Sequence, residues 1–265
     1  MITLSALLLL ALPSPAPARL APAGLAPSIT QDDEKPDKRE EVKELLDTFS
    51  GHVKKRGDED LEAIGIIDTL LKEFPESGPK DRKEIVSSLS KALKEKRRED
   101  ENGVRDNKLF LAVGVALGEM GPESTPELMG WIDHKSHRKD LALQRVLILS
   151  LGKTKDEKKG MKALMDLLIH KDAPVQAAAA EALGNYTHLD QKERKVPFEE
   201  ILKVLNSVSN AKDADLTDRI ARERYDVIAA PMITTLQALS GADVRDPNEW
   251  RTWWNKNKKK NWDEQ

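Results

Sequence analysis

Three stretches of the chain follow one ten-residue pattern that ends in glycine: 109–118 (LFLAVGVALG), 143–152 (LQRVLILSLG) and 175–184 (VQAAAAEALG). Their glycines are 34 and 32 residues apart. Counted back from each glycine, the residues at 9, 6, 5, 2 and 1 positions are apolar or small, and this spacing places them on one face of a helix. We expect the small residues to let neighbouring helices approach closely, and the glycine to adopt the left-handed conformation that closes a helix.

Amphipathic segments surround the three copies, and none shows the sustained alternation that predicts a strand. One apolar stripe, for example, contains Leu61, Ile64, Ile67 and Leu70. A helix pair of about 30–40 residues cannot bury its apolar face alone, so such pairs stack on one another. The sequence therefore predicts an all-α fold of about five antiparallel helix pairs. The segments expected to complete these pairs are 37–74, 79–96, 122–134, 156–170, 196–207 and 216–239, with a polar break at 209–215 and a kink or split at Pro231.

The third copy carries the most specific motif. Its stretch 172–184 (DAPVQAAAAEALG) resembles the second-helix consensus of the HEAT repeat family, D-x-x-V-R-x-x-A-A-x-A-L-G, although Gln176 replaces the usual Arg. Gln144 and Phe110 hold the matching places in the other copies. The resemblance spans residues 80–241 and implies a right-handed α-solenoid domain over 37–241. It implies little about function, because the family is defined by its packing.

The C-terminal part, 242–265, predicts a capping helix followed by a basic tail. Asp246-Pro247-Asn248-Glu249 combines an N-cap residue, a proline at the first helical position and a glutamate three residues after the cap. Trp250, Trp253 and Trp254 then share one helix face, and Trp262 follows. This ending resembles that of HEAT-repeat proteins from planctomycete-like bacteria. Sealing the last repeat is the expected role, and a stacking platform for a sugar or peptide is the alternative.

The N-terminal part has the pattern of an export signal. Residues 4–12 (LSALLLLAL) form an apolar run that is shorter than the roughly 20 residues needed to cross a bilayer. Ala16-Pro17-Ala18 follows as a small-x-small cleavage pattern, although the first three residues carry no positive charge. We therefore predict a signal peptide over 1–18, a Pro/Ala-rich linker over 19–36 and an extracytoplasmic, periplasmic or secreted protein.

Composition excludes several kinds of chemistry. The chain has no cysteine, which excludes disulfides, thiolate zinc sites, iron–sulfur clusters and cysteine nucleophiles. Only 4% of its residues are aromatic, and its net charge of −3 indicates neither a nucleic acid nor an anionic membrane. No nucleophile elbow or phosphate-binding glycine loop is present, so we predict no catalytic residue and no cofactor.

Two groups of polar residues have an alternative functional interpretation. His134 and His137 beside Asp133, with His170 and Asp172 one repeat later, offer imidazole and carboxylate metal ligands. Their spacing matches no known zinc site, so we interpret them as polar turn residues and predict no metal. The basic runs, which acidic residues interrupt or flank, are interpreted as solvated helix ends; they are 54–56, 94–98 and 256–260.

The function class that we predict is a non-enzymatic scaffold that binds a protein or peptide on the concave surface of the repeats. Gln144, Gln176 and Glu181, at positions of the second helices that should face solvent, are the expected partner contacts. A HEAT-like lyase-type enzyme that attaches or detaches a chromophore is one alternative. A nucleic-acid-binding HEAT-like protein is another.

Overall fold

The computed structural model describes residues 35–98, 101 and 106–264, and the chain divides into two units, 1–31 and 32–265. The predicted signal peptide and residues 19–34 of the predicted linker therefore lie outside the described residues. Within the described residues all regular structure is helical, which confirms the all-α prediction. The α-helices are α1 (Glu40–Val53), α2 (Asp60–Glu73), α3 (Pro79–Ala92), α4 (Lys108–Glu119), α5 (Thr125–Trp131), α6 (Leu141–Lys153), α7 (Lys159–Leu167), α8 (Ala173–Leu183), α9 (Gln191–Ala214), α10 (Arg219–Ser240) and α11 (Pro247–Asn257).

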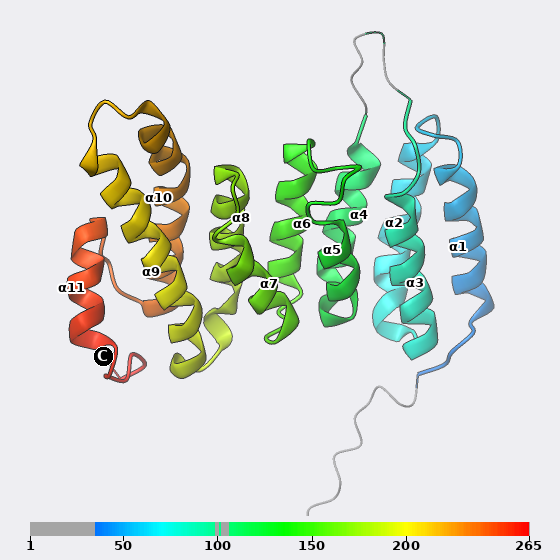
Figure 1. The fold of residues 1–265 in the computed structure, drawn as a ribbon. Helices are drawn as coiled ribbons and strands as arrows, with labels where there is room; N and C mark the ends of the chain where they lie inside the picture. Colours follow the sequence, from blue (N-terminus) through cyan, green and yellow to red (C-terminus); the bar gives the residue numbers. More distant parts are fainter. Residues whose placement is uncertain (1–34, 99–100, 102–105, 265) are drawn as a thin grey trace, which may run out of the picture. The chain divides into compact units, whose positions relative to one another are not determined.

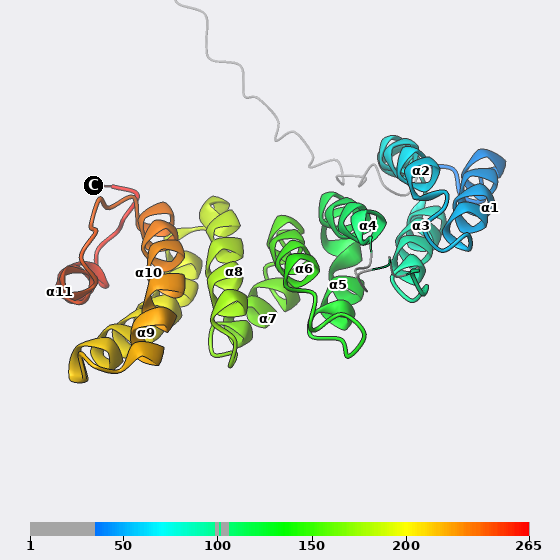
Figure 2. The ribbon, with the colours of Figure 1, turned by 90° about the horizontal axis from the view of Figure 1, so that it is seen from above.

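The helices of the unit 32–265 form two layers (Figures 1 and 2). The helices α1, α3, α5, α7 and α9 contact one another in that order, and α2, α4, α6, α8 and α10 form the second series. Each odd-numbered helix up to α9 also contacts the even-numbered helix that follows it in the chain. We call the even-numbered series the second helices. The apolar core lies between the two layers.

The repeated pattern marks the buried face of the second helices. Of its fifteen positions, all but Ala112 and Val146 are buried. Its glycines have a different role from the one expected, because Gly184 has φ −62° and neither Gly118 nor Gly152 has a positive φ. The prediction of left-handed glycines is therefore wrong at these three positions. Such a glycine does end α10, where Gly241 has φ 73° and donates its N–H to the Gln237 carbonyl.

The pattern glycines instead allow neighbouring second helices to touch through their backbones. A methyl group added to Gly118 would lie 2.8 Å from Ser150 Cβ, and one added to Gly114 would lie 2.9 Å from Val146 Cγ1. Between α6 and α8 the same relationship joins Gly152 to Ala182. From Gly114–Val146 to Gly118–Ser150 the residue numbers increase together on both helices, so α4 and α6 run in parallel. The prediction that small residues permit close approach is confirmed.

The last helix pair differs from its prediction. The predicted polar break at 209–215 lies almost entirely within α9, where Val208 and Ser209 are buried. The break is confined to residues 215–218, where the Asp218 side chain caps α10 by accepting the Ala221 N–H. Pro231 does not split α10, which continues through it to Ser240.

The α11 helix packs beside the first half of α9 (Figure 1). Asp246 accepts the Asn248 N–H and so confirms the predicted N-cap. The ring of Phe198, on α9, lies 5.7 Å from that of Trp250, 5.1 Å from Trp254 and 5.1 Å from Trp262. Trp250 is fully buried. The predicted tryptophan stripe therefore packs against the last helix pair.

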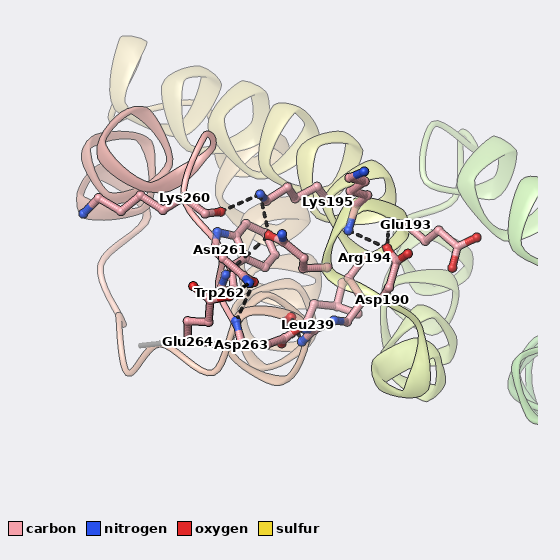
Figure 3. A network of polar contacts seen from close by, with 12 residues as sticks. Asp190, Glu193, Arg194, Lys195, Leu239, Lys260, Asn261, Trp262, Asp263 and Glu264 are labelled. Atoms are coloured by element: carbon pink, nitrogen blue, oxygen red, sulfur yellow. Dashed lines mark hydrogen bonds and ion pairs between the residues drawn. The ribbon is translucent and has the colours of Figure 1, made fainter. Parts of the chain in front are cut away.

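The segment after α11 folds back on the start of α9 (Figure 3). Arg194 donates to the Leu239 carbonyl at 2.8 Å and also pairs with Asp263. Lys195 donates to the Lys260 carbonyl at 2.8 Å and lies 5.0 Å from the centre of the Trp262 ring. Burial and the neighbouring Arg194 lower the pKa of Lys195. The predicted basic tail is thus held against the fold by main-chain and side-chain bonds.

Candidate partner-binding groove

The groove follows from the small side chains of α8. Six of the eleven residues in its sequence APVQAAAAEAL are alanine, and Ala177 is the one alanine in 177–180 that lines an open hollow. The flanking helices present longer side chains, including Leu141 and Arg145 on α6 and Val227 on α10. Because α8 lies in contact with both α6 and α10, its surface is recessed between theirs.

Two hollows make up this surface, which we call the α8 groove. The first has a volume of about 470 Å³ and begins where α6 and α8 begin, and the second, of about 650 Å³, lies toward their C-terminal ends. Glu181 and Pro231 line both hollows and join them. Most of the other lining side chains are apolar or small, among them Leu141, Ile148, Leu149, Val175, Ala177, Val227, Ala230 and Ala238.

The charged residues of the α8 groove neutralise one another. Arg145 Nη2 lies 2.7 Å from Glu181 Oε2, and both side chains are about half exposed. Beside them, Lys153 pairs with Glu119 of α4 at 2.8 Å. Exposed pairs of this kind contribute only about 0–1 kcal/mol, so a partner's charges can replace them at little cost. The groove therefore offers apolar anchoring area with exchangeable charges at its centre.

Two of the three predicted contact residues are buried, so their expected solvent-facing position is wrong. Gln144 is 3% exposed, and its Oε1 accepts the Asp133 N–H at 2.7 Å. Gln176 is 1% exposed and donates to the Leu168 carbonyl at 2.6 Å. Each side chain points back to the turn before its own helix and satisfies a main-chain group there. The two glutamines therefore link each turn to the helix that follows it.

Glu181 is exposed in the groove, as its predicted role requires, and Gln144 contributes to the edge of the first hollow. Gln176 lies outside the residues that line either hollow and instead accepts a hydrogen bond from Arg224 of α10 at 2.8 Å. The contribution of α10 to the wall of the groove was not predicted from the sequence. Its signal was the spacing of Ala230, Thr234 and Ala238, three exposed small residues four apart.

The histidines lie in separate polar contacts. His137 Nε2 is 2.7 Å from the Leu93 carbonyl, and His170 Nδ1 accepts the Asp172 N–H at 3.1 Å. Among the residues that the structure describes, no three His, Asp or Glu side chains are grouped as metal ligands. In the same part of the chain, no helix is both long and apolar enough to span a bilayer.

Comparisons with known proteins add no relative: no family model matches the chain, and neither curated proteins nor solved structures give a match. The function must therefore be inferred from the sequence pattern and from the groove itself.

Proposed function

We propose that this protein is a non-enzymatic scaffold of HEAT-like repeats, a right-handed α-solenoid that holds a segment of a partner protein in the α8 groove. The observation that carries the proposal is the groove itself, an apolar hollow over α8 that Glu181 and Pro231 join to a second one. Concave sites lined mainly by apolar groups with a few polar ones are the usual form of binding sites.

The parallel second helices support the solenoid class. The spacing between Gly114 and Val146 equals that between Gly118 and Ser150, so α4 and α6 meet at two successive turns in one register. Gly152 and Ala182 extend the relationship to α8. A series of equivalent contacts between neighbouring units, with a cap at the end, is the arrangement of an α-solenoid.

The chemistry of the groove favours binding over catalysis. A lyase-type enzyme needs several polar groups that converge on its substrate, whereas Arg145 and Glu181 are committed to each other and most of the lining is apolar. A nucleic-acid interface needs a surplus of positive charge. Here Arg145 is balanced by Glu181, and Lys153 by Glu119.

The dimensions of α8 indicate what the groove accepts. Its eleven residues correspond to about 16 Å of helix axis. That length suits about three turns of a partner helix or about five residues of extended chain. Apolar side chains of the segment would enter the two hollows, and a charged one would exchange with Arg145 or Glu181. With the predicted export signal, we place this binding outside the cytoplasm.

Selection from a random peptide library displayed on phage tests the proposal. The substitution Ala177→Leu fills the floor of the groove, while Ala211→Leu makes the same change at an exposed position of α9. We expect enriched peptides that bind the wild type and the Ala211→Leu variant but bind Ala177→Leu about tenfold more weakly or worse. Peptides that bind all three proteins equally, or a library that yields none, would contradict the proposal.

A further inference from the structure

The first helix pair of the array has an open outer side. No helix of the described chain precedes α1, and α1 and α2 lie at one end of the array in Figure 1. A hollow of about 480 Å³ lies between the two helices on this side. Leu45, in this hollow, is on the opposite side of α1 from Lys43 and Ser50, which line the hollow toward α3. Leu45 and Ile66 of α2 are both partly buried and supply the apolar lining.

Carboxylates surround this hollow. Glu41, Glu44 and Glu73 line it, and Glu62 lies on the same face of α2, one helical turn before the hollow. The cation in the lining is Arg39, which lies 2.6 Å from Glu73 Oε2 and 3.9 Å from Glu41 Oε2. Glu44 and Glu62 are exposed and make no ion pair within the described residues. We call the surface formed by these four glutamates the acidic end.

The acidic end remains negative when every charged residue of the first helix pair is counted. The segment 39–73 contains ten Asp and Glu residues and six Lys and Arg residues, including the basic run of the α1–α2 turn. Arg97 and Arg98 reach this segment from beyond α3 and pair with Asp60 and Asp58. With both arginines included, the net charge is still −2.

The opposite end of the array is basic. Helix α11 directs Trp250 toward α9, and the other side of α11 is polar. The segments 191–203 and 245–264, which pack together here, contain ten Lys and Arg residues and seven Asp and Glu residues, so their net charge is +3. We call this surface the basic end. Its exposed cations that make no ion pair within the described residues include Arg251, Lys256, Lys258 and Lys259.

We propose that the acidic end of one molecule binds the basic end of a second copy, so that copies of this chain associate head to tail. The opposite charges of the two ends attract, whereas a contact between two acidic ends or two basic ends brings like charges together. The aliphatic parts of lysine side chains can pack along Leu45 and Ile66 while their ammonium groups reach the surrounding carboxylates. A hollow with an apolar lining and a rim of carboxylates fits side chains of this kind.

A second copy of the chain satisfies both ends, whereas other partners satisfy one. A nucleic acid would pair with the basic end and leave the acidic end open, and a basic peptide would do the reverse. The acidic and basic ends lie at opposite ends of the array (Figure 1), so a molecule that is bound through one keeps the other available. A contact between two different surfaces that does not close on itself produces an open chain of molecules.

The two ends are separate from the α8 groove, and neither proposal depends on the other. The groove is lined mainly by residues of α6, α8 and α10. A head-to-tail chain would therefore present one groove for each molecule, and a partner with several binding segments would gain affinity from occupying several grooves.

Sedimentation velocity of the full chain over a range of protein concentrations tests the proposal. We expect the average mass to rise with concentration at about 0.01 M salt, where the Debye length is about 30 Å. At about 1 M salt, where the Debye length is about 3 Å, the mass should fall to that of the monomer. Neutralising either end should weaken association by about tenfold or more, and the two variants are E41Q/E44Q/E62Q and K256Q/K258Q/K259Q. Their control, K158Q/K159Q/K162Q, removes three exposed lysines at the start of α7 and should associate as the wild type does.

Mixing the two neutralised variants distinguishes a head-to-tail contact from any other. The first variant keeps an intact basic end and the second an intact acidic end, so an equimolar mixture should form dimers of one copy each and no longer chains. Dimers in the mixture also show that both variants are folded. A wild type that stays monomeric at low salt, a variant that associates alone as the wild type does, or a mixture without dimers would overturn the proposal. Association that nuclease treatment abolishes would overturn it in favour of a nucleic acid on the basic end.

Discussion

A methyl group on Gly152 would lie 2.5 Å from the carbonyl oxygen of Ala182, closer than any real side chain approaches backbone. The two helices meet there without side chains between them. We therefore expect Gly152→Ala to force α6 and α8 apart and to destabilise the protein by about 1–3 kcal/mol, the range for overpacked sites. Urea denaturation followed by circular dichroism measures the change.

Gly65 provides the matched control for this substitution. It lies within α2, and an added methyl group would meet nothing within 4 Å. Alanine is favoured over glycine in a helix interior by about 1 kcal/mol, so Gly65→Ala should stabilise the protein slightly. Equal effects of Gly65→Ala and Gly152→Ala would show that the helices are not in backbone contact.

Ala177 belongs to the lining of the groove, and Ala179 belongs to the packed interior. Ala179 is completely buried, and Ala177, which is 6% exposed, lines the first hollow. We expect Ala179→Leu to cost about 1–3 kcal/mol through overpacking, and Ala177→Leu to cost much less because its side chain extends into open space. Thermal melts of the two variants compare them directly. The same melting temperature for both would mean that α8 is rotated from the position described above.

Asp60 and Arg97 form a buried ion pair, with side chains 2% and 1% exposed. Burial raises the pKa of Asp60, and Arg97 acts in the opposite direction. Arg97→Met leaves the carboxylate buried and unpaired, so we expect it to cost about 3–5 kcal/mol near neutral pH. Because the pKa of Asp60 is raised in the folded state, protonation of Asp60 stabilises the fold, and this stabilisation is lost as pH rises through the raised pKa. The variant should therefore regain stability as pH falls from 7 toward about 4.

The double variant D60N/R97M controls for the pH effect. It has no carboxylate at position 60, so its stability relative to the wild type should not show the recovery at low pH. At neutral pH it should be more stable than Arg97→Met, because an amide is cheaper to bury than an ion. The free energy of unfolding is measured in buffers across this pH range. Parallel curves for the single and double variants would contradict the assignment of the pH dependence to Asp60.

The tryptophan cluster predicts the effect of removing the end of the chain. Trp250 is fully buried against Phe198, and truncating such a residue to alanine costs about 3–5 kcal/mol. A chain that stops after Asp246 loses all four aromatic partners of Phe198 and exposes the face of α9 around that residue. We expect it to aggregate or to be partly unfolded in gel filtration and circular dichroism. A monomeric, fully helical product of unchanged thermal stability would instead support the ligand-platform alternative.

The predicted export signal has its own test. Because 4–12 is apolar and Ala16-Pro17-Ala18 follows, the mature protein should begin at or shortly after Arg19. N-terminal sequencing of protein isolated outside the cytoplasm checks this. Cytosolic protein that retains Met1 would show that the segment is not a cleaved signal.

The sequence predicted the helices better than it predicted what each position does. Periodicity identifies a buried face, and it located Val113 and Leu147 correctly. It also placed Leu61 in an apolar stripe, although that side chain is exposed and its neighbour Asp60 is buried with Arg97. The ion pair depends on a contact between distant segments, which local spacing does not record.

The candidate site was less predictable for the same reason. Glutamine at 144 and 176 looked solvent-facing because it is polar, yet main-chain groups of the preceding turns bind both side chains. The groove arises because the small side chains of α8 lie between the longer side chains of α6 and α10. Val227 of α10 is 43 residues beyond Gly184 in the chain. Residues that are distant in the sequence but adjacent in the fold therefore define this site.

The glycine contacts also set the offset between equivalent residues of successive second helices. Gly118 is level with Ser150, and Gly152 with Ala182, so in each step the equivalent glycine lies two residues beyond its level partner. Two residues correspond to about 3 Å along a helix axis. Equivalent positions are therefore shifted along the helix axis in the same direction at each step from α4 to α6 to α8. A ligand that crosses these helices at a right angle meets a different residue of the repeat at every step, and one that meets the same residue each time has to run obliquely.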